Sequence, residues 1–165
     1  AVGYPLHSDI VTPYIEHYGN EPIKKKYLPN IISGECILAI AMTEPGAGSD
    51  LQNIKTTAID KGDHYLVNGS KTFITNGYLC NAAVVAVKTD PTQGAKGISL
   101  LLMEAGADGF TKGKPFHKIG LHSQDTCELF FDNVKVPKEN LLGIEGHGFR
   151  YMITELSQER LVVAI

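Results

Sequence analysis

Residues 41–50 read Ala-Met-Thr-Glu-Pro-Gly-Ala-Gly-Ser-Asp, and residues 71–77 read Lys-Thr-Phe-Ile-Thr-Asn-Gly. Each segment joins an apolar run typical of a β-strand to small or hydroxyl-bearing residues typical of a turn. The first follows a predicted buried strand over 37–42, and its proline and glycines stop a helix and let the backbone approach a ligand. The second ends a strand pattern on Asn76-Gly77, a frequent turn dipeptide. The two segments predict a β-rich domain whose loops can contact a ligand.

The glycines match no phosphate-binding motif. Gly46-Ala-Gly48-Ser49 lacks a Gly-Lys-Ser/Thr ending and precedes no predicted helix, and Tyr151 replaces the third glycine of a motif starting at Gly146. On spacing alone, the first segment is better explained as a plain turn and the second as a strand running into a hairpin, because turns use these residue types.

Composition indicates one compact domain, or one domain with appendages. The chain has 165 residues, 43% of them apolar, and a net charge of −3, which argues against a nucleic-acid-binding surface. Lys24–Lys26 is the only basic run and is interpreted as a solvated helix face. No apolar stretch reaches the ~18 residues of a membrane span. No signal or transit peptide is recognisable, and because the sequence starts without Met we expect a missing N-terminus.

Cysteines and histidines form no disulfide or metal pattern. Cys36, Cys80 and Cys127 are odd in number and far apart, so they are interpreted as small buried apolar side chains. The six histidines lack ligand spacing, and the sequence predicts no metal site.

The chain divides into a predicted helical part (1–36), a β part (37–145) and a final helix (146–165). Gly19-Asn20 breaks the first part, and Pro22 lies in the first turn of its second helix. Regular short strands with turn signals between them predict an antiparallel barrel or sandwich. The expected strands are 37–43, 55–60, 64–75, 82–89, 97–104 and 127–136, with a weaker one at 110–112; the continuous apolar runs 82–87 and 98–103 indicate burial on both faces.

The final helix carries an apolar stripe and stops without a cap. A helical projection places Phe149, Met152, Ile153, Leu156 and Val163 on one side. We therefore expect the chain to belong to a longer protein in which further helices cover this stripe.

Together and in this order, the two quoted segments resemble the middle domain of the acyl-CoA dehydrogenases. Lys24–Pro29 with Ser33-Gly-Glu35 looks like the last helix of the family's N-terminal domain, and Asn53 departs from the small residue usual there. The resemblance implies an α+β fold, an antiparallel β-barrel or sandwich flanked by helices of truncated N- and C-terminal domains. Later strands match the family at Gly120, Ser123, Thr126, Phe130 and Val134–Pro137.

The resemblance implies FAD-dependent α,β-dehydrogenation of an acyl-CoA in fatty-acid β-oxidation. In the family a carboxylate removes the α-proton while the β-hydrogen leaves as hydride to flavin N5. An electron-transfer flavoprotein as acceptor, a homotetramer, and a location in the bacterial cytoplasm or mitochondrial matrix are also implied. An acyl-CoA oxidase and a non-catalytic β-module remain alternatives.

The resemblance also implies site residues. Those expected to bind the cofactor are Ile40, Ala41, Met42, Thr43, Gly48, Ser49, Phe73, Ile74 and Thr75. Those expected to bind substrate are Ser49, Lys88, Thr89, Ser157, Gln158 and Arg160. Without the resemblance, Phe73 is equally well explained as an ordinary core residue.

The expected catalytic base lies in the final helix. On spacing alone, Glu159 is a boundary residue of the apolar stripe, and Arg160 falls near the stripe's centre, where a guanidinium needs a buried acceptor. The stretch Glu-Leu-x-Gln-Glu-Arg-Leu resembles the long-chain branch of the family, which places the catalytic Glu directly before this Arg. The resemblance implies Glu159 as the base. Glu155 points further from the stripe in the helical projection, so we expect its replacement by Gln to leave the protein active.

Overall fold

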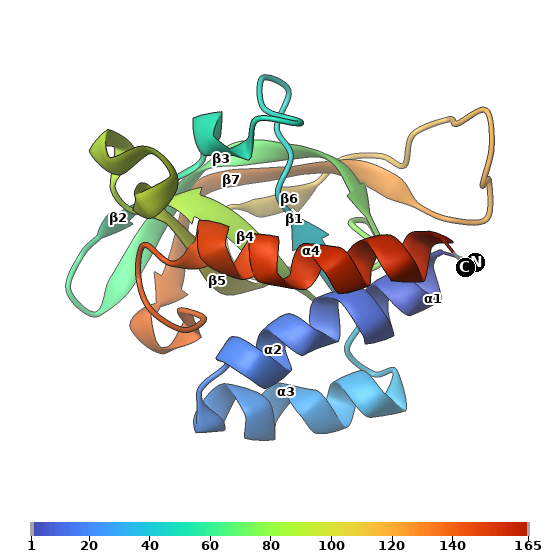
Figure 1. Cartoon of the computed structure of the whole chain (residues 1–165), viewed down its shortest axis with the longest axis horizontal. Coiled ribbons are helices and arrows are strands. Elements are labelled where there is room, and N and C mark those ends of the chain that lie inside the picture. Colours follow the sequence, from blue (N-terminus) through green and yellow to red (C-terminus); the bar gives the residue numbers. More distant parts are fainter. Residues whose placement is uncertain (1, 165) are drawn as a thin grey trace.

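A curled sheet of seven strands packs against a layer of helices (Figure 1). The computed structural model describes residues 2–164. The strands are β1 (Leu38–Ala41), β2 (Thr57–Asp60), β3 (His64–Thr75), β4 (Ala82–Lys88), β5 (Ile98–Glu104), β6 (Phe110–Lys112) and β7 (Thr126–Pro137). The helices are α1 (Gly3–Pro5), a π-helix (Leu6–Val11), α2 (Thr12–Tyr18), α3 (Glu21–Ser33) and α4 (Gly148–Ala164), with 3-10 turns at Leu51–Asn53, Pro91–Gly97 and Lys138–Asn140. The predicted α+β class is confirmed, and every predicted strand is present.

The N-terminal helices begin and end at the residues that the sequence marks. Pro13 lies in the first turn of α2, which ends before Gly19. Asn20 caps α3 because its side-chain oxygen accepts a hydrogen bond from the Ile23 N–H at 2.9 Å. Gly34 ends α3 in the left-handed conformation, with φ at 80°.

The sheet order is β1-β4-β2-β3-β7-β6, with β5 paired to β4. Most pairs are antiparallel as expected, but β1 and, at one position, β2 pair parallel with β4. Strands β2 and β3 intervene along the chain, so β4 is reached by a long connection rather than a tight turn. Asn76 adopts φ 60° and forms the predicted turn, but β4 does not pair with β3. The hairpin interpretation of this turn is therefore wrong.

Strands β4 and β5 separate two apolar cores. Alternate residues such as Val84 and Leu100 pack against the helices, while Val85 and Leu101 pack inside the curl of the sheet. This confirms that both apolar runs are buried on two faces. The three cysteines are free and buried, as predicted.

Helix α4 crosses between the sheet and the N-terminal helices (Figure 1). Its first residue, Gly148, touches β5 so closely that a Cβ would lie 2.7 Å from the Ser99 carbonyl carbon. Its buried residues are Gly148, Met152 and Glu155, whereas Ile153 and Val163 of the predicted stripe are exposed. The stripe is therefore buried only in part, because α2 and the π-helix cover a different side of α4. No helix in the described part of the chain has the length and apolar character to cross a membrane.

The exposed apolar side chains of α4 predict association. Ile153, Leu156 and Val163 are 56%, 39% and 66% exposed, and a helical projection places them on one side of α4. We expect the 165-residue chain, produced alone, to self-associate in size-exclusion chromatography, since a contiguous apolar patch favours burial. Replacing Ile153 and Val163 by Gln should shift the chain towards monomer. A monodisperse unsubstituted monomer would contradict this expectation.

Candidate functional site

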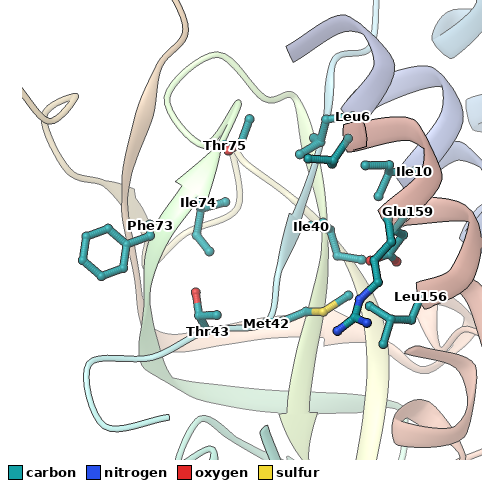
Figure 2. Close-up of a pocket in the computed structure, with 12 residues that line it drawn as sticks. Leu6, Ile10, Ile40, Met42, Thr43, Phe73, Ile74, Thr75, Leu156 and Glu159 are labelled. Atoms are coloured by element: carbon teal, nitrogen blue, oxygen red, sulfur yellow. The ribbon is translucent and has the colours of Figure 1, made fainter. Parts of the chain in front are cut away.

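A cavity of about 400 Å³ lies where β1 and β3 end against helix α4 and the π-helix. Figure 2 shows Leu156 and Glu159 facing Ile40 and Met42 across it. Its walls are mainly apolar, with few polar groups, which is typical of small-molecule sites. The lining residues are Leu6, Ile10, Ile40, Met42, Thr43, Phe73, Ile74, Thr75, Leu156, Glu159, Arg160 and Val163.

Hydrogen bonds join the two sequence segments that decide the fold. The Thr72 N–H donates to the Thr43 carbonyl at 2.9 Å. The Thr43 hydroxyl donates to the Thr72 carbonyl at 2.5 Å. The loop after β1 and the end of β3 are therefore fixed to each other at the cavity wall.

A buried ion pair reinforces this junction. Lys71 Nζ lies 2.9 Å from Glu44 Oε1 and donates to the Met42 carbonyl at 2.9 Å. Burial lowers the pKa of Lys71 to about 8, against the opposing effect of Glu44. Burial alone would raise the pKa of Glu44, but Lys71 and the N–H groups of Lys55 and Thr56 outweigh it and hold that pKa below its ordinary value. Each member of the pair therefore favours the charged form of the other.

Phe73 is 70% exposed, although it lies in a strand. Its φ of 57° is unusual for an aromatic residue. The pairing of β3 with β7 shifts between Lys71 and Ile74, so a bulge turns Phe73 out of the core. The interpretation of Phe73 as a core residue is wrong. An exposed aromatic ring on strained backbone beside a cavity indicates a ligand-binding surface.

Thr75 ends β3 at the cavity. Its hydroxyl oxygen accepts a hydrogen bond from Gln124 Nε2 at 3.0 Å. Gln124 Oε1 is buried and has no hydrogen-bond partner among residues 2–164. The amide therefore retains one unused acceptor beside Thr75.

Glu159 is the only carboxylate among the lining residues, and it is half-buried. Its Oε1 accepts a hydrogen bond from the Tyr14 hydroxyl at 2.7 Å. Burial raises the pKa of Glu159 above its ordinary value; the Tyr14 hydrogen bond opposes this effect, and the charge of Glu155 adds to it. A carboxylate of raised proton affinity at a cavity wall is suited to take a proton from a bound molecule.

Glu155 lies further from the predicted stripe than Glu159 but is the more deeply buried of the two. It is buried, accepts a hydrogen bond from the Tyr18 hydroxyl at 2.7 Å, and lies 3.0 Å from His17 Nδ1. Glu155 is buried for the same reason that the apolar stripe is buried only in part: α2 packs on the side of α4 that carries Glu155.

Eight of the predicted site residues line the cavity, and seven do not. The eight are Ile40, Met42, Thr43, Phe73, Ile74, Thr75, Glu159 and Arg160. The seven are Ala41, Gly48, Ser49, Lys88, Thr89, Ser157 and Gln158.

The residues outside the cavity have other surroundings. Ala41 packs in the inner core. Gly48 and Ser49 are exposed in the loop after β1, and Ser157 is exposed on α4. Gln158 donates to the Asp9 carbonyl at 2.9 Å. A separate cavity of about 190 Å³ is lined by Lys88, and the Thr89 hydroxyl bonds to that of Ser99.

Arg160 and Asn53 also differ from expectation. Arg160 is exposed and has no acceptor in the described part of the chain, so the predicted buried acceptor is absent there. Asn53 ends a 3-10 turn and donates to the Asp50 carboxylate, which accommodates the larger side chain without positive φ.

Sequence patterns missed several contributors to the site. Leu6 and Ile10 complete the cavity, Tyr14 binds Glu159, and Lys71 pairs with Glu44. The lysine within a predicted strand was the one indication in the sequence, but no neighbouring residue identifies its partner. Among residues 2–164 no group of three His, Cys, Asp or Glu side chains could hold a metal ion.

Family models match most of the chain. That of the acyl-CoA dehydrogenase middle domain matches residues 39–134, and that of the acyl-CoA dehydrogenase N-terminal domain matches 1–35. The mitochondrial long-chain specific acyl-CoA dehydrogenase of Sus scrofa is 53% identical over 98% of this chain and 38% of its own length. An acyl-CoA dehydrogenase of Bacillus subtilis is 46% identical over 99% of this chain and 44% of its own.

A solved structure is also similar to this chain. The crystal structure of an acyl-CoA dehydrogenase from Geobacillus kaustophilus has a TM-score of 0.97 and 61% identity, and the match covers 99% of this chain and 43% of that one. The chain therefore spans less than half the length of these relatives.

Proposed function

Because the chain belongs to the acyl-CoA dehydrogenase family, we propose that the full-length protein, in which this chain is joined to the remainder found in its relatives, oxidises an acyl-CoA thioester with FAD. The observation that carries this proposal is the cavity in which the half-buried carboxylate of Glu159 faces the apolar strip of Ile40 and Met42. Such a carboxylate suits the removal of a weakly acidic proton next to a thioester carbonyl.

The cavity fits a flavin ring. Ile40, Met42 and Ile74 supply apolar wall for the ring faces, and the hydroxyls of Thr43 and Thr75 suit its polar edge. The exposed ring of Phe73 adds an aromatic surface beside them. FAD, when bound, supplies a hydride acceptor.

The chain's own residues hold and deprotonate the substrate. Ile40 and Met42 exclude water from the reacting carbons, and Glu159 takes the α-proton. Desolvation of Glu159 raises its affinity for that proton. Arg160 lies at the same wall and is placed to interact with the polar part of the thioester.

The wider assignments rest on the relatives. We assign residues 1–36 to the N-terminal helical domain, 37–145 to the β-domain and 146–165 to the first helix of the C-terminal domain. We further propose an electron-transfer flavoprotein as electron acceptor, a homotetramer, and a location in the bacterial cytoplasm or mitochondrial matrix.

Anaerobic mixing of the flavin-loaded full-length protein with acyl-CoA thioesters tests the proposal. Bleaching of the visible flavin absorbance by the thioester, together with formation of an enoyl-CoA, is the expected result. Unchanged absorbance across short, long and branched acyl chains would contradict it. Rapid reoxidation in air with release of peroxide would identify an acyl-CoA oxidase instead.

Replacing Thr75 by Val tests the hydroxyl at the flavin edge. The near-isosteric change suits a strand, so the fold should persist. We expect FAD to bind about 5-fold or more weakly, because one hydrogen bond to the ring edge is lost, or its visible spectrum to shift. Equilibrium dialysis and absorbance spectra measure both. Thr111→Val, at an exposed position of β6, is the matched control. Identical behaviour of the two variants would assign Thr75 a strand role only.

A further inference from the structure

Helix α2 brings a buried tyrosine to the carboxylate of Glu159. Tyr14 is completely buried in the core between the helices and the sheet, so packing fixes its ring. Its hydroxyl donates to Glu159 Oε1 at 2.7 Å. No residue of the described chain hydrogen-bonds to the second oxygen, Oε2. One carboxylate oxygen is therefore held, and the other is available on a side chain that lines the cavity.

From this geometry we propose that Tyr14 is a positioning residue for Glu159, holding the carboxylate so that Oε2 meets the α-proton of the acyl-CoA. The proposal rests on the proposed function, in which Glu159 is the base. A glutamate side chain has several rotatable bonds, and proton transfer is sensitive to small displacements of the base. A donor fixed by core packing removes much of this freedom. Burial and the neighbouring Glu159 raise the pKa of Tyr14, so its hydroxyl stays protonated and donates.

The groups facing Glu159 come from three helices. Helix α2 contributes His17 and Tyr18 besides Tyr14, and both contact Glu155, the nearest other carboxylate of α4. Arg160 follows Glu159 on α4. The π-helix packs against α4 and carries two further titratable residues: Asp9, which bonds to Ser8, and His7, which bonds to backbone groups of Ile31 and Leu38. Strand β1 contributes no titratable side chain.

These neighbours give the sign of the expected pH effect. The Tyr14 hydrogen bond stabilises the charged form of Glu159 and so lowers its pKa, against burial and Glu155. Without the hydroxyl, the pKa of Glu159 rises further. The base then becomes protonated at higher pH, and the acid limb of the rate profile moves upward in pH.

Tyr14→Phe in the flavin-loaded full-length protein tests the proposal. We expect the rate of flavin bleaching by acyl-CoA to fall about 10- to 100-fold, the effect of one hydrogen bond to a charged group. FAD content and acyl-CoA affinity should stay within about twofold of the wild-type values, as expected when an interaction stabilises the transition state alone. The acid limb of the pH profile should move to higher pH.

Tyr27→Phe is the matched control. Tyr27 is also buried on an N-terminal helix and donates to a glutamate, Glu104, at 2.6 Å, but that pair lies outside the cavity. We expect this variant to keep the wild-type rate and pH profile. If both Tyr→Phe variants keep them, the positioning role of Tyr14 is refuted. A slower Tyr14→Phe protein with depleted FAD and an unmoved acid limb would refute it too, because that pattern indicates structural damage.

Glu159→Gln in the same assay separates the two proposals. An inactive Glu159→Gln protein with an unaffected Tyr14→Phe protein would refute the positioning role and leave the function standing. An active Glu159→Gln protein would refute Glu159 as the base, and the role of Tyr14 with it.

Discussion

Glu159→Gln should abolish turnover in the full-length protein while leaving FAD and acyl-CoA binding intact. The amide preserves the size of the side chain and can still accept the Tyr14 hydrogen bond. It cannot take up a proton, and loss of a general base costs about 1,000-fold or more. Stopped-flow measurement of anaerobic flavin bleaching by an acyl-CoA determines the rate. Bleaching at the wild-type rate would place the base in the part of the protein beyond this chain.

The control for this variant must avoid Glu155. That residue is buried and bonded to Tyr18 and His17, so its substitution would disturb packing next to Glu159. Glu16→Gln makes the same chemical change at an exposed position of α2 without hydrogen bonds to other described side chains. We expect it to retain the wild-type rate.

Local patterns predicted the elements of this fold well. Strand limits follow from apolar runs and turn residues that lie next to each other, so the limits of β3 at residues 64 and 75 could be predicted from the sequence. Helix limits follow from caps such as Asn20 and Gly34 in the same way. The parallel pairing of β1 with β4 could not be predicted from local sequence, because it depends on how the chain between the two strands folds.

The site was predictable where a motif extends along the chain and not where it depends on packing. The residues 73–75 and 159–160, which the resemblance assigns to one site, line one cavity. The contact between Tyr14 and Glu159 joins positions 145 residues apart. Helical periodicity does not predict which side of α4 packs against α2. The same limit explains why the sequence did not predict the burial of Glu155. The partner of Lys71 is likewise chosen by the crossing of two segments rather than by spacing.

Lys71→Met should destabilise the fold more than any other single change considered for the cavity wall. Methionine fills a similar volume but leaves the buried carboxyl group of Glu44 without its cation. Breaking a buried pair in this way costs about 3–5 kcal/mol. The change also removes the bond to the Met42 carbonyl, which supports the junction with Thr43. Urea denaturation of the full-length protein, followed by circular dichroism, measures the free energy of unfolding.

Lys26→Met provides the matched control, because Lys26 Nζ lies 2.7 Å from Glu104 Oε1 in an ion pair whose side chains are 64% and 51% exposed. Solvent screens such a pair, so its loss should cost less than about 1 kcal/mol. Adding Glu44→Gln to Lys71→Met removes the unpaired charge while keeping one acceptor for the N–H groups of Lys55 and Thr56. The double variant should therefore recover part of the lost stability. Equal small losses for Lys71→Met and Lys26→Met would show that the buried pair does not hold the two segments together, and the cavity wall would then owe its rigidity to the backbone bonds between Thr43 and Thr72.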